Sequence, residues 1–185
     1  STPLPARVVI DDGTSDRIVW TDATGTLEVP VAPGTLRVSI SRGLEYDAFV
    51  ASSVVVADGA TVPVDARLER VVDTAGWIAL DTHLHSELST DSTFPVDDRI
   101  RAVAAEGIEV PVSTDHDMIT DYNPIIHELG LDDWLGTLIG AEVSSLIWGH
   151  LNGFPFIPKP DRTGNGAPSW LARSPAEAFQ AMHDT

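Results

Sequence analysis

Two histidines separated by one residue, His83 and His85, are the side chains whose type and spacing point most directly to chemistry. They end an expected strand, and residues i and i+2 of a strand face the same side, so both imidazoles can reach one cation. In parallel α/β sheets, sites form at the carboxyl ends of the strands. By itself the pair is a weak signal, because two surface histidines, or one satisfied in the core, are the commoner explanation; the other histidines and acidic residues of the chain must be considered with it.

Each later expected strand also brings a metal-ligating residue type. His116 follows the second strand, Glu142 closes the third, and His150 lies on the fourth. Four of the six histidines of the chain and one glutamate thus gather at strand ends, which favours a metal site over a chance distribution. The other two, His127 and His183, fall in expected helices and are interpreted as solvated residues.

Alternating strand-like and helix-like stretches after Gly76 must position these ligands. Pro95 suits the first turn of a helix that Gly107 ends, and Gly130 ends another. Ser174 and Glu177 form a capping box that opens the last helix. Repeated βα units predict a parallel sheet, open or closed into a barrel. The expected strands are 77–85, 108–114, 137–143 and 146–152, and the helices are 96–106, 123–130 and one that begins after Ser174.

Residues 6–70 follow a different pattern, with short runs of β-branched residues between Gly, Pro and Asp turns. Leu36, Val38 and Ile40 alternate with polar residues, as in a strand with one buried face. Regular spacing of such runs predicts a small antiparallel β-sandwich. The runs are 7–10, 18–21, 26–31, 35–41, 47–57 and 61–68. We therefore expect a sandwich domain at 1–72 and an α/β domain at 73–185.

Composition excludes several classes of function. The 185 residues carry 11 Lys and Arg against 28 Asp and Glu, a formal charge of −17, which argues against nucleic-acid and anionic-membrane partners. Cysteine is absent, so thiolate chemistry is excluded. No apolar run approaches the ~18–20 residues that cross a bilayer. A cytoplasmic location and export with a removed signal peptide both stay open.

Two stretches of the sequence resemble known families. Residues 21–27 followed by 31–38, with an Asp-x-x-Gly turn and a Pro-Gly corner, are similar to the carboxypeptidase-regulatory-like, or prealbumin-like, β-sandwich. This resemblance implies an accessory module, either as structural support or as a ligand-binding sandwich.

From Gly76 onward the chain resembles the PHP (polymerase and histidinol phosphatase) metal-dependent hydrolases. The matching text is Asp81-Thr82-His83-Leu84-His85-Ser86 with Asp91, then Thr114-Asp115-His116, Gly140-x-Glu142 and Gly149-His150. The resemblance implies a distorted (β/α)7 barrel with a two- or three-metal site at its carboxyl face. A prealbumin-like module before a PHP domain is similar to the branch of the family that includes carbamate and ester hydrolases.

The resemblance also implies a ligand set. His83, His85 and Glu142 would hold a first metal, Glu142 would bridge to a second held by His150, and Asp91 with His116 would hold a third. Imidazole and carboxylate ligands suit Zn, Mn or Fe. Such ions generate a nucleophile from water and bind the attacking and leaving oxygens, which allows ester hydrolysis without a Ser or Cys nucleophile.

Several polar residues have two interpretations. Asp81, Asp115 and Asp117 are either turn-capping residues or carboxylates that orient imidazoles and transfer protons, and we take Asp115 and Asp117 as catalytic candidates. Candidates for substrate binding are Lys159, Arg162 and Asn152. A solvated surface position is the somewhat favoured interpretation of the two cationic side chains.

The chain departs from the PHP pattern after His150, where no later strand with further ligands is found. We therefore expect an incomplete barrel, with impaired metal binding and activity, that a separate chain or an oligomer completes. The predicted function is metal-dependent hydrolysis of phosphoesters with a small-molecule substrate. Carboxylic or carbamic ester hydrolysis and a non-catalytic metal-binding scaffold are the alternatives. The amidohydrolases also start with His-x-His but use a carboxylated lysine, for which only Lys159 is available.

Overall fold

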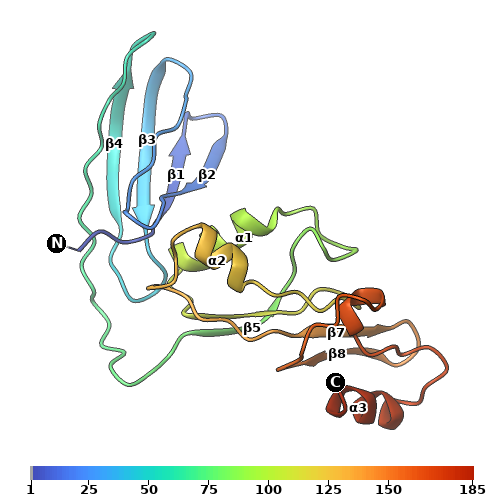
Figure 1. The fold of residues 1–185 in the computed structure, drawn as a ribbon. Helices are drawn as coiled ribbons and strands as arrows, with labels where there is room; N and C mark the ends of the chain where they lie inside the picture. Colours follow the sequence, from blue (N-terminus) through green and yellow to red (C-terminus); the bar gives the residue numbers. More distant parts are fainter. Residues whose placement is uncertain (1) are drawn as a thin grey trace. The chain divides into compact units, whose positions relative to one another are not determined.

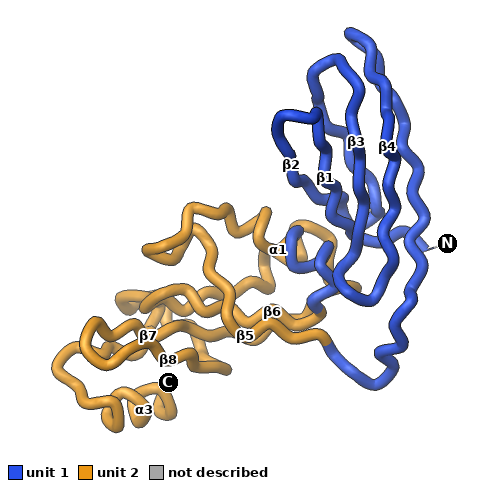
Figure 2. Tube along the Cα trace, turned by 180° about the vertical axis from the view of Figure 1, so that it is seen from behind, with its two compact units in different colours: residues 1–78, 101–108 blue, residues 79–100, 109–185 orange. Residues whose placement is uncertain are grey.

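A computed structural model describes residues 2–185. The fold is mixed, with antiparallel sheets and a few helices, and the described residues form no closed barrel. The chain divides into two compact units: unit 1 takes the chain up to Ile78 together with Arg101–Ile108, and unit 2 takes Ala79–Ile100 with Glu109–Thr185 (Figure 2). The expected domain boundary after residue 72 stays a prediction. No helix within 2–185 is both long and apolar enough to span a bilayer.

Unit 1 is built on one four-stranded antiparallel sheet in the order β2-β1-β3-β4 (Figure 1). The strands are β1 (Arg7–Asp11), β2 (Asp16–Trp20), β3 (Gly34–Ser41) and β4 (Phe49–Val56). Four of the six expected strands are thereby confirmed. The alternation predicted for β3 is confirmed, because Leu36 and Val38 face the core; Val8 and Ile10, every second residue of β1, face it as well.

The strands expected at 26–31 and 61–68 are absent from the described structure, and this part of the sandwich prediction is wrong at the level of hydrogen bonding. Both segments are extended, and Leu27, Val29 and Val64 pack against the core of the sheet. Pro30 and Pro63 lie within them, and proline has no amide hydrogen for a ladder. The segments therefore cover the sheet loosely, over a hollow of about 810 Å³.

Unit 2 contains two small sheets. The strands β5 (Leu80–Leu84) and β6 (Val110–Ser113) pair in parallel, and α1 (Val96–Ala105) lies between them in sequence. The strands β7 (Ala141–Ser145) and β8 (Gly149–Gly153) pair antiparallel. The parallel β5–β6 pair follows the sequence-based prediction, as does the end of α1, where Gly107 has a φ of 73°.

The expectation of a parallel fourth strand is wrong. Residues 146–148 form a tight turn, so β8 returns beside β7 as a hairpin. A connection of three residues cannot carry the chain back for a parallel pairing, which needs a crossover of a dozen or more. Two isolated bridges nevertheless run parallel here: Leu138, before β7, bridges Val112 of β6, and Glu142 of β7 bridges His116, which follows β6.

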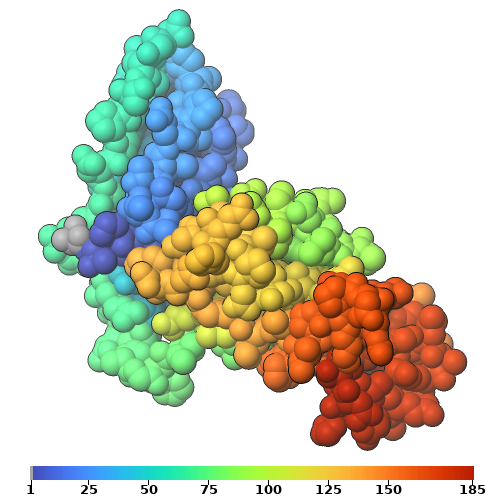
Figure 3. Space-filling view, in the orientation of Figure 1, coloured from blue at the N-terminus to red at the C-terminus, as the bar shows by residue number. Residues whose placement is uncertain are grey.

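Three short helical segments complete unit 2: α2 (Asn123–Glu128), a 3-10 turn (Thr163–Gly166) and α3 (Pro175–His183). The predicted capping box is confirmed, because the Ser174 hydroxyl accepts from the Glu177 amide and the Glu177 carboxylate accepts from the Ser174 amide. Helix α3 packs beside the β7–β8 hairpin, where Met182 lies against Gly153 (orange to red in Figure 3).

Candidate metal centre

A bulge at the end of β5 sets the position of the first histidine. Asp81 pairs with Pro111, yet Leu84 pairs only two residues later on β6, so β5 carries one extra residue. Pro111 cannot donate to the ladder, and the strand bulges where that donor is missing. The Asp81 carboxylate accepts from the His83 amide at 3.0 Å, and the Thr114 hydroxyl bonds both the amide and the carbonyl of Leu84, at 2.9 and 3.0 Å.

A fully buried carboxylate, Asp115, holds the segment after His85. It accepts from the Ser86 amide at 2.7 Å, from the Ser86 hydroxyl at 3.1 Å and from the Thr120 hydroxyl at 2.5 Å. Buried carboxylates need such donors, because an unpaired buried charge is strongly destabilising. Asp115 therefore fixes the chain directly after His85 to the loop that follows His116.

The β7–β8 hairpin brings Glu142 and His150 to the same face. Glu142 pairs with Asn152 and Ser144 with His150, and side chains of directly opposed residues project on the same side of an antiparallel sheet. The antiparallel hairpin therefore brings His150 beside Glu142, whereas the sequence had led us to expect His150 on a further parallel strand. Gly140 permits the close approach before β7, because a Cβ there would lie 2.6 Å from the Gly153 carbonyl oxygen.

Asp117 links this hairpin to its surroundings. Its carboxylate accepts from the Ser144 amide at 3.1 Å and from the Trp170 indole at 3.2 Å, and its own amide donates to the Glu142 carbonyl at 2.8 Å. Its φ of 51° lies in the left-handed region, which aspartate tolerates better than most residues. Asp81, Asp115 and Asp117 thus all accept hydrogen bonds from backbone or indole N–H groups beside the ligand residues.

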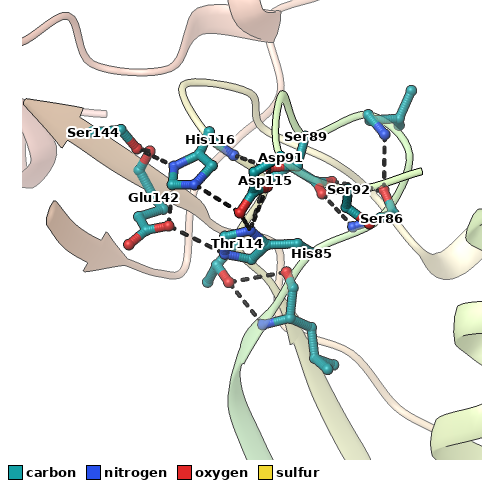
Figure 4. Close-up of polar contacts among 12 residues, drawn as sticks. His85, Ser86, Ser89, Asp91, Ser92, Thr114, Asp115, His116, Glu142 and Ser144 are labelled. Carbon is teal, nitrogen blue, oxygen red and sulfur yellow. Dashed lines mark hydrogen bonds and ion pairs between the residues drawn. The ribbon is translucent and has the colours of Figure 1, made fainter. Parts of the chain in front are cut away.

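Four imidazoles surround the Glu142 carboxylate, and Figure 4 shows two of them, His85 and His116, joined to it by dashed lines. Glu142 Oε2 lies 3.4 Å from His83 Nε2 and 3.1 Å from both His85 Nε2 and His116 Nδ1, and Oε1 lies 3.1 Å from His150 Nδ1. The Glu142 side chain is 4% exposed, against 54% for His83 and 46% for His150. The carboxylate forms the floor of the site, and two histidines form its accessible rim.

Asp91 joins the cluster from the loop after β5. Its carboxylate oxygens lie 2.9 Å from His85 Nδ1 and 3.3 Å from His116 Nε2, and one accepts from the Ser89 hydroxyl at 2.7 Å. The hydrogen bond from His85, followed by that from Ser89, holds the pKa of Asp91 well below its usual range. Asp91 is therefore an ionised carboxylate at neutral pH.

The side chains present fit divalent cations. Glu142 Oε2 and His85 Nε2 are buried without a hydrogen-bond partner, although unsatisfied buried polar atoms each cost about 1–3 kcal/mol. Two ligand atoms that are each about 2.1 Å from one cation lie roughly 3.0–3.4 Å apart at octahedral or tetrahedral angles. The separations around Glu142 match that spacing, and a cation would satisfy both orphaned atoms.

The candidate ligands form three overlapping groups, and within each group the ligand atoms lie within 4.8 Å of one another. Each group takes its members from segments far apart in the sequence, and all six residues proposed as metal ligands belong to at least one. The groups are His83, His85 and Glu142; His85, Asp91 and His116; and His116, Glu142 and His150.

The candidates for substrate binding are placed differently. Asn152 is exposed on β8 opposite Glu142, at the edge of the cluster. Lys159 and Arg162 lie in the loop 158–168, which contacts the segment after His116 through bonds of Gly164 and Asn165 to Ile119. Within residues 2–185 neither cation forms an ion pair. His127 and His183 lie outside the three groups, on α2 and α3.

Sequence reasoning missed the hydroxyl groups of the site. Ser89 bonds Asp91 and accepts from the His116 amide at 3.1 Å, Ser144 contacts His116 Nδ1, and Thr114 bridges the bulge. Their spacing from the ligands could have indicated them, because Ser144 is two residues after Glu142 on one strand and Ser89 is two residues before Asp91.

No protein-family model, no curated protein and no solved structure matches this chain. The function is accordingly proposed from the arrangement of the residues themselves.

Proposed function

We propose that the chain carries the metal-binding part of a hydrolase that cleaves ester bonds with water activated at two or three divalent cations. The observation that supports this proposal best is the buried carboxylate of Glu142 with ring nitrogens of four histidines within 3.4 Å. The resemblance to the PHP family leads to the same ligand set and, with it, to unit 2 as part of a (β/α)7 barrel.

The roles of the ligands are those that the resemblance implies, and the three overlapping groups of ligand atoms are compatible with them. His83 and His85 would hold one cation with Glu142, His150 would hold a second that Glu142 bridges, and Asp91 with His116 would hold a third. When bound, Zn, Mn or Fe supplies the Lewis acidity that lowers the pKa of a coordinated water from ~15.7 to about 7. The exposed rings of His83 and His150 leave the cluster open to a substrate on one side.

Asp115 and Asp117 serve this site as positioning residues. The Asp115 carboxylate is fully buried, and both carboxylates are engaged by amide, hydroxyl or indole donors. A group that transfers a proton to the substrate must reach it within hydrogen-bond distance. Their proposed contribution is therefore to hold the backbone beside His85 and Ser144.

Phosphoesters are the first candidate substrate class. The scarcity of cationic side chains at the cluster supports neutral carboxylic and carbamic esters as the second. Arg99 donates its Nε to the His85 carbonyl at 2.9 Å and stacks on Phe94, so it supports the backbone of the site. Among the described residues, neither Lys159 nor Arg162 forms an ion pair with Asp91 or Glu142. A phosphate dianion would thus depend on the cations alone, whereas carboxylic and carbamic esters need no cationic side chain.

The test compares hydrolysis of aryl phosphates, aryl carboxylic esters and aryl carbamates by the full-length protein. The variants are His83→Ala and Glu142→Gln, and His127→Ala is the matched control because His127 lies outside the cluster. Loss of turnover in the first two variants and after chelation, with His127→Ala unchanged, is the expected result. Turnover that survives Glu142→Gln would overturn the proposal, and stoichiometric metal without turnover would favour the non-catalytic scaffold.

A further inference from the structure

The hollow of about 810 Å³ in unit 1 lies between the sheet and the two extended segments that cover it. Small-molecule sites in proteins are cavities of about 300–1,000 Å³, so the hollow has the size of a ligand site. In Figure 1 and Figure 2 alike, the segment after β4 returns alongside that strand. Pro30 and Pro63 lie in the two segments, and proline lacks the amide hydrogen that strand pairing needs. The space is therefore a consequence of the sequence of these segments.

The sheet side of the hollow is aliphatic. Of the described residues, the strands contribute only aliphatic side chains to the lining, among them Leu36 and Val38 of β3 and Val54 and Val56 of β4. The opposite side adds further aliphatic side chains, such as Val64, and the lining contains no aromatic ring within residues 2–185. Apolar walls offer water few hydrogen-bond partners, so an apolar group displaces that water favourably. Without rings on which a planar ligand could stack, these walls favour an aliphatic ligand.

The hollow extends along most of the sheet. Its lining runs from Ile40, near one end of β3, to Val56 of β4, which pairs with Gly34 at the other end of β3. At a rise of about 3.4 Å per residue, this span is roughly 20 Å. A space of that length between two layers suits an extended chain better than a compact molecule.

The charged residues of the lining are mostly acidic. They are Glu28, Asp58 and Asp65 against Arg67 alone, and Arg67 already forms an ion pair with Glu69 at 3.2 Å. A carboxylate or phosphate head group would therefore meet an excess of negative charge, which opposes binding. Threonine hydroxyl groups in the same lining can bond an uncharged polar head.

We propose that the hollow of unit 1 binds an uncharged amphiphile with an unbranched aliphatic chain, such as a long-chain alcohol. The chain lies between the apolar face of the sheet and the extended segments, and hydroxyl groups of the lining bond the polar head. All lining residues belong to unit 1. The site is thus independent of the metal centre proposed in unit 2, and either can be tested without the other.

The test is isothermal titration of the full-length protein with 1-octanol, and octanoate serves as the probe of head-group charge. Val54→Trp and Val64→Trp fill the hollow from its two sides. Val55→Trp is the matched control, because Val55 lies on the opposite face of β4 and is 66% exposed. Val64 is outside the ladders of the sheet, so Val64→Trp decides where circular dichroism shows that Val54→Trp has lost the sheet.

The wild type and Val55→Trp should bind 1-octanol with equal affinity and with a negative heat-capacity change, which marks burial of apolar surface. Octanoate should bind at least about 10-fold more weakly, and both filled variants should lose at least about 10-fold in affinity for 1-octanol. Chelation of metal should change none of these values. The proposal would be overturned by a wild type that does not bind 1-octanol, by unchanged affinity in the folded filled variants, or by octanoate that binds as tightly as 1-octanol.

Discussion

Both units have an apolar core, but they differ in the polar content of their interiors. The core of unit 1 is made of aliphatic residues on alternating positions of β1 and β3. Unit 2 buries an apolar cluster of Ile119, Ala141 and Phe156 and, in addition, many polar residues, among them Ser86, Ser113, Thr114, Asp115 and Glu142. Apolar burial is non-directional, whereas each buried polar group needs a specific partner. Unit 1 can therefore tolerate loose packing, but the arrangement in unit 2 depends on individual hydrogen bonds.

Glu142→Gln should have the largest effect, because it removes the charge at the centre of four imidazoles. We expect zinc affinity to fall more than about 100-fold, beyond what loss of an outer partner of a ligand causes. Glu142 lies in unit 2, and the amide keeps the shape of the side chain. The unfolding free energy of unit 1 should therefore equal that of the wild type. Isothermal titration with zinc and denaturant unfolding measure the two effects, and wild-type affinity in the variant would contradict the assignment.

Leu36→Ala tests the other side of the comparison. Leu36 is buried in the core of unit 1 and borders the hollow beneath the extended segments. Because the substitution enlarges a space that already exists, the loss of unfolding free energy should be at the lower end for leucine, about 2 kcal/mol. Zinc affinity should not change. A loss near 5 kcal/mol would show that the core is packed more tightly than described.

Asp115→Asn addresses the polar interior of unit 2. The amide keeps the shape but loses the charge that three donors address, so we expect unit 2 to lose about 1.5 kcal/mol. Zinc affinity should fall modestly, since Asp115 fixes the backbone after His85. Urea titration of the metal-free protein gives the first quantity. An unchanged midpoint would mean that the segment after β5 is held by other contacts.

Ser174→Ala should cost less, about 1 kcal/mol, because it removes one side of the capping box of α3. No ligand residue is on this helix, so zinc binding should be retained. Ser169→Ala is a suitable control, since Ser169 lies outside the helix. Amide hydrogen exchange in α3 reports the fraying, and equal exchange in both variants would argue against a capping role.

The smallest effect should be a pH dependence of the stability of unit 1 that arises from Asp12. The Thr14 hydroxyl, followed by the amides of Thr14 and Ser15, lowers the pKa of Asp12 from 3.8 to about 2. A carboxyl whose folded pKa is depressed stabilises the fold above its unfolded pKa and loses that contribution as pH falls through the folded value. The advantage of the wild type over Asp12→Asn should therefore disappear between pH 3.8 and about 2. An advantage independent of pH would point to hydrogen bonding without titration.

The sequence predicted the elements of unit 1 and unit 2 best where the pattern is local. Alternation identified β3, a run of β-branched residues identified β1, and Gly107 and Ser174 located helix ends. The pattern did not reveal that Pro30 and Pro63 keep two apolar segments out of the sheet. It also placed His150 on a parallel strand, although a three-residue turn returns β8 beside β7.

Residue type and spacing predicted the ligand candidates, but their partners depend on contacts between distant segments. Asp117 and Ser144 are 27 residues apart, and nothing in the spacing links them. The bulge at His83 similarly arises from Pro111, on another strand. Such pairings become visible only when the backbone of both segments is known.

The most direct test of the metal centre is anomalous diffraction from crystals of the full-length protein grown with zinc, recorded on both sides of the zinc edge. The account predicts anomalous peaks about 2.0–2.2 Å from the ring nitrogens of His83 and His85 and from a Glu142 oxygen, with a separate peak near Asp91 and His116. No peak at these residues, or zinc bound only at His127 and His183, would contradict it.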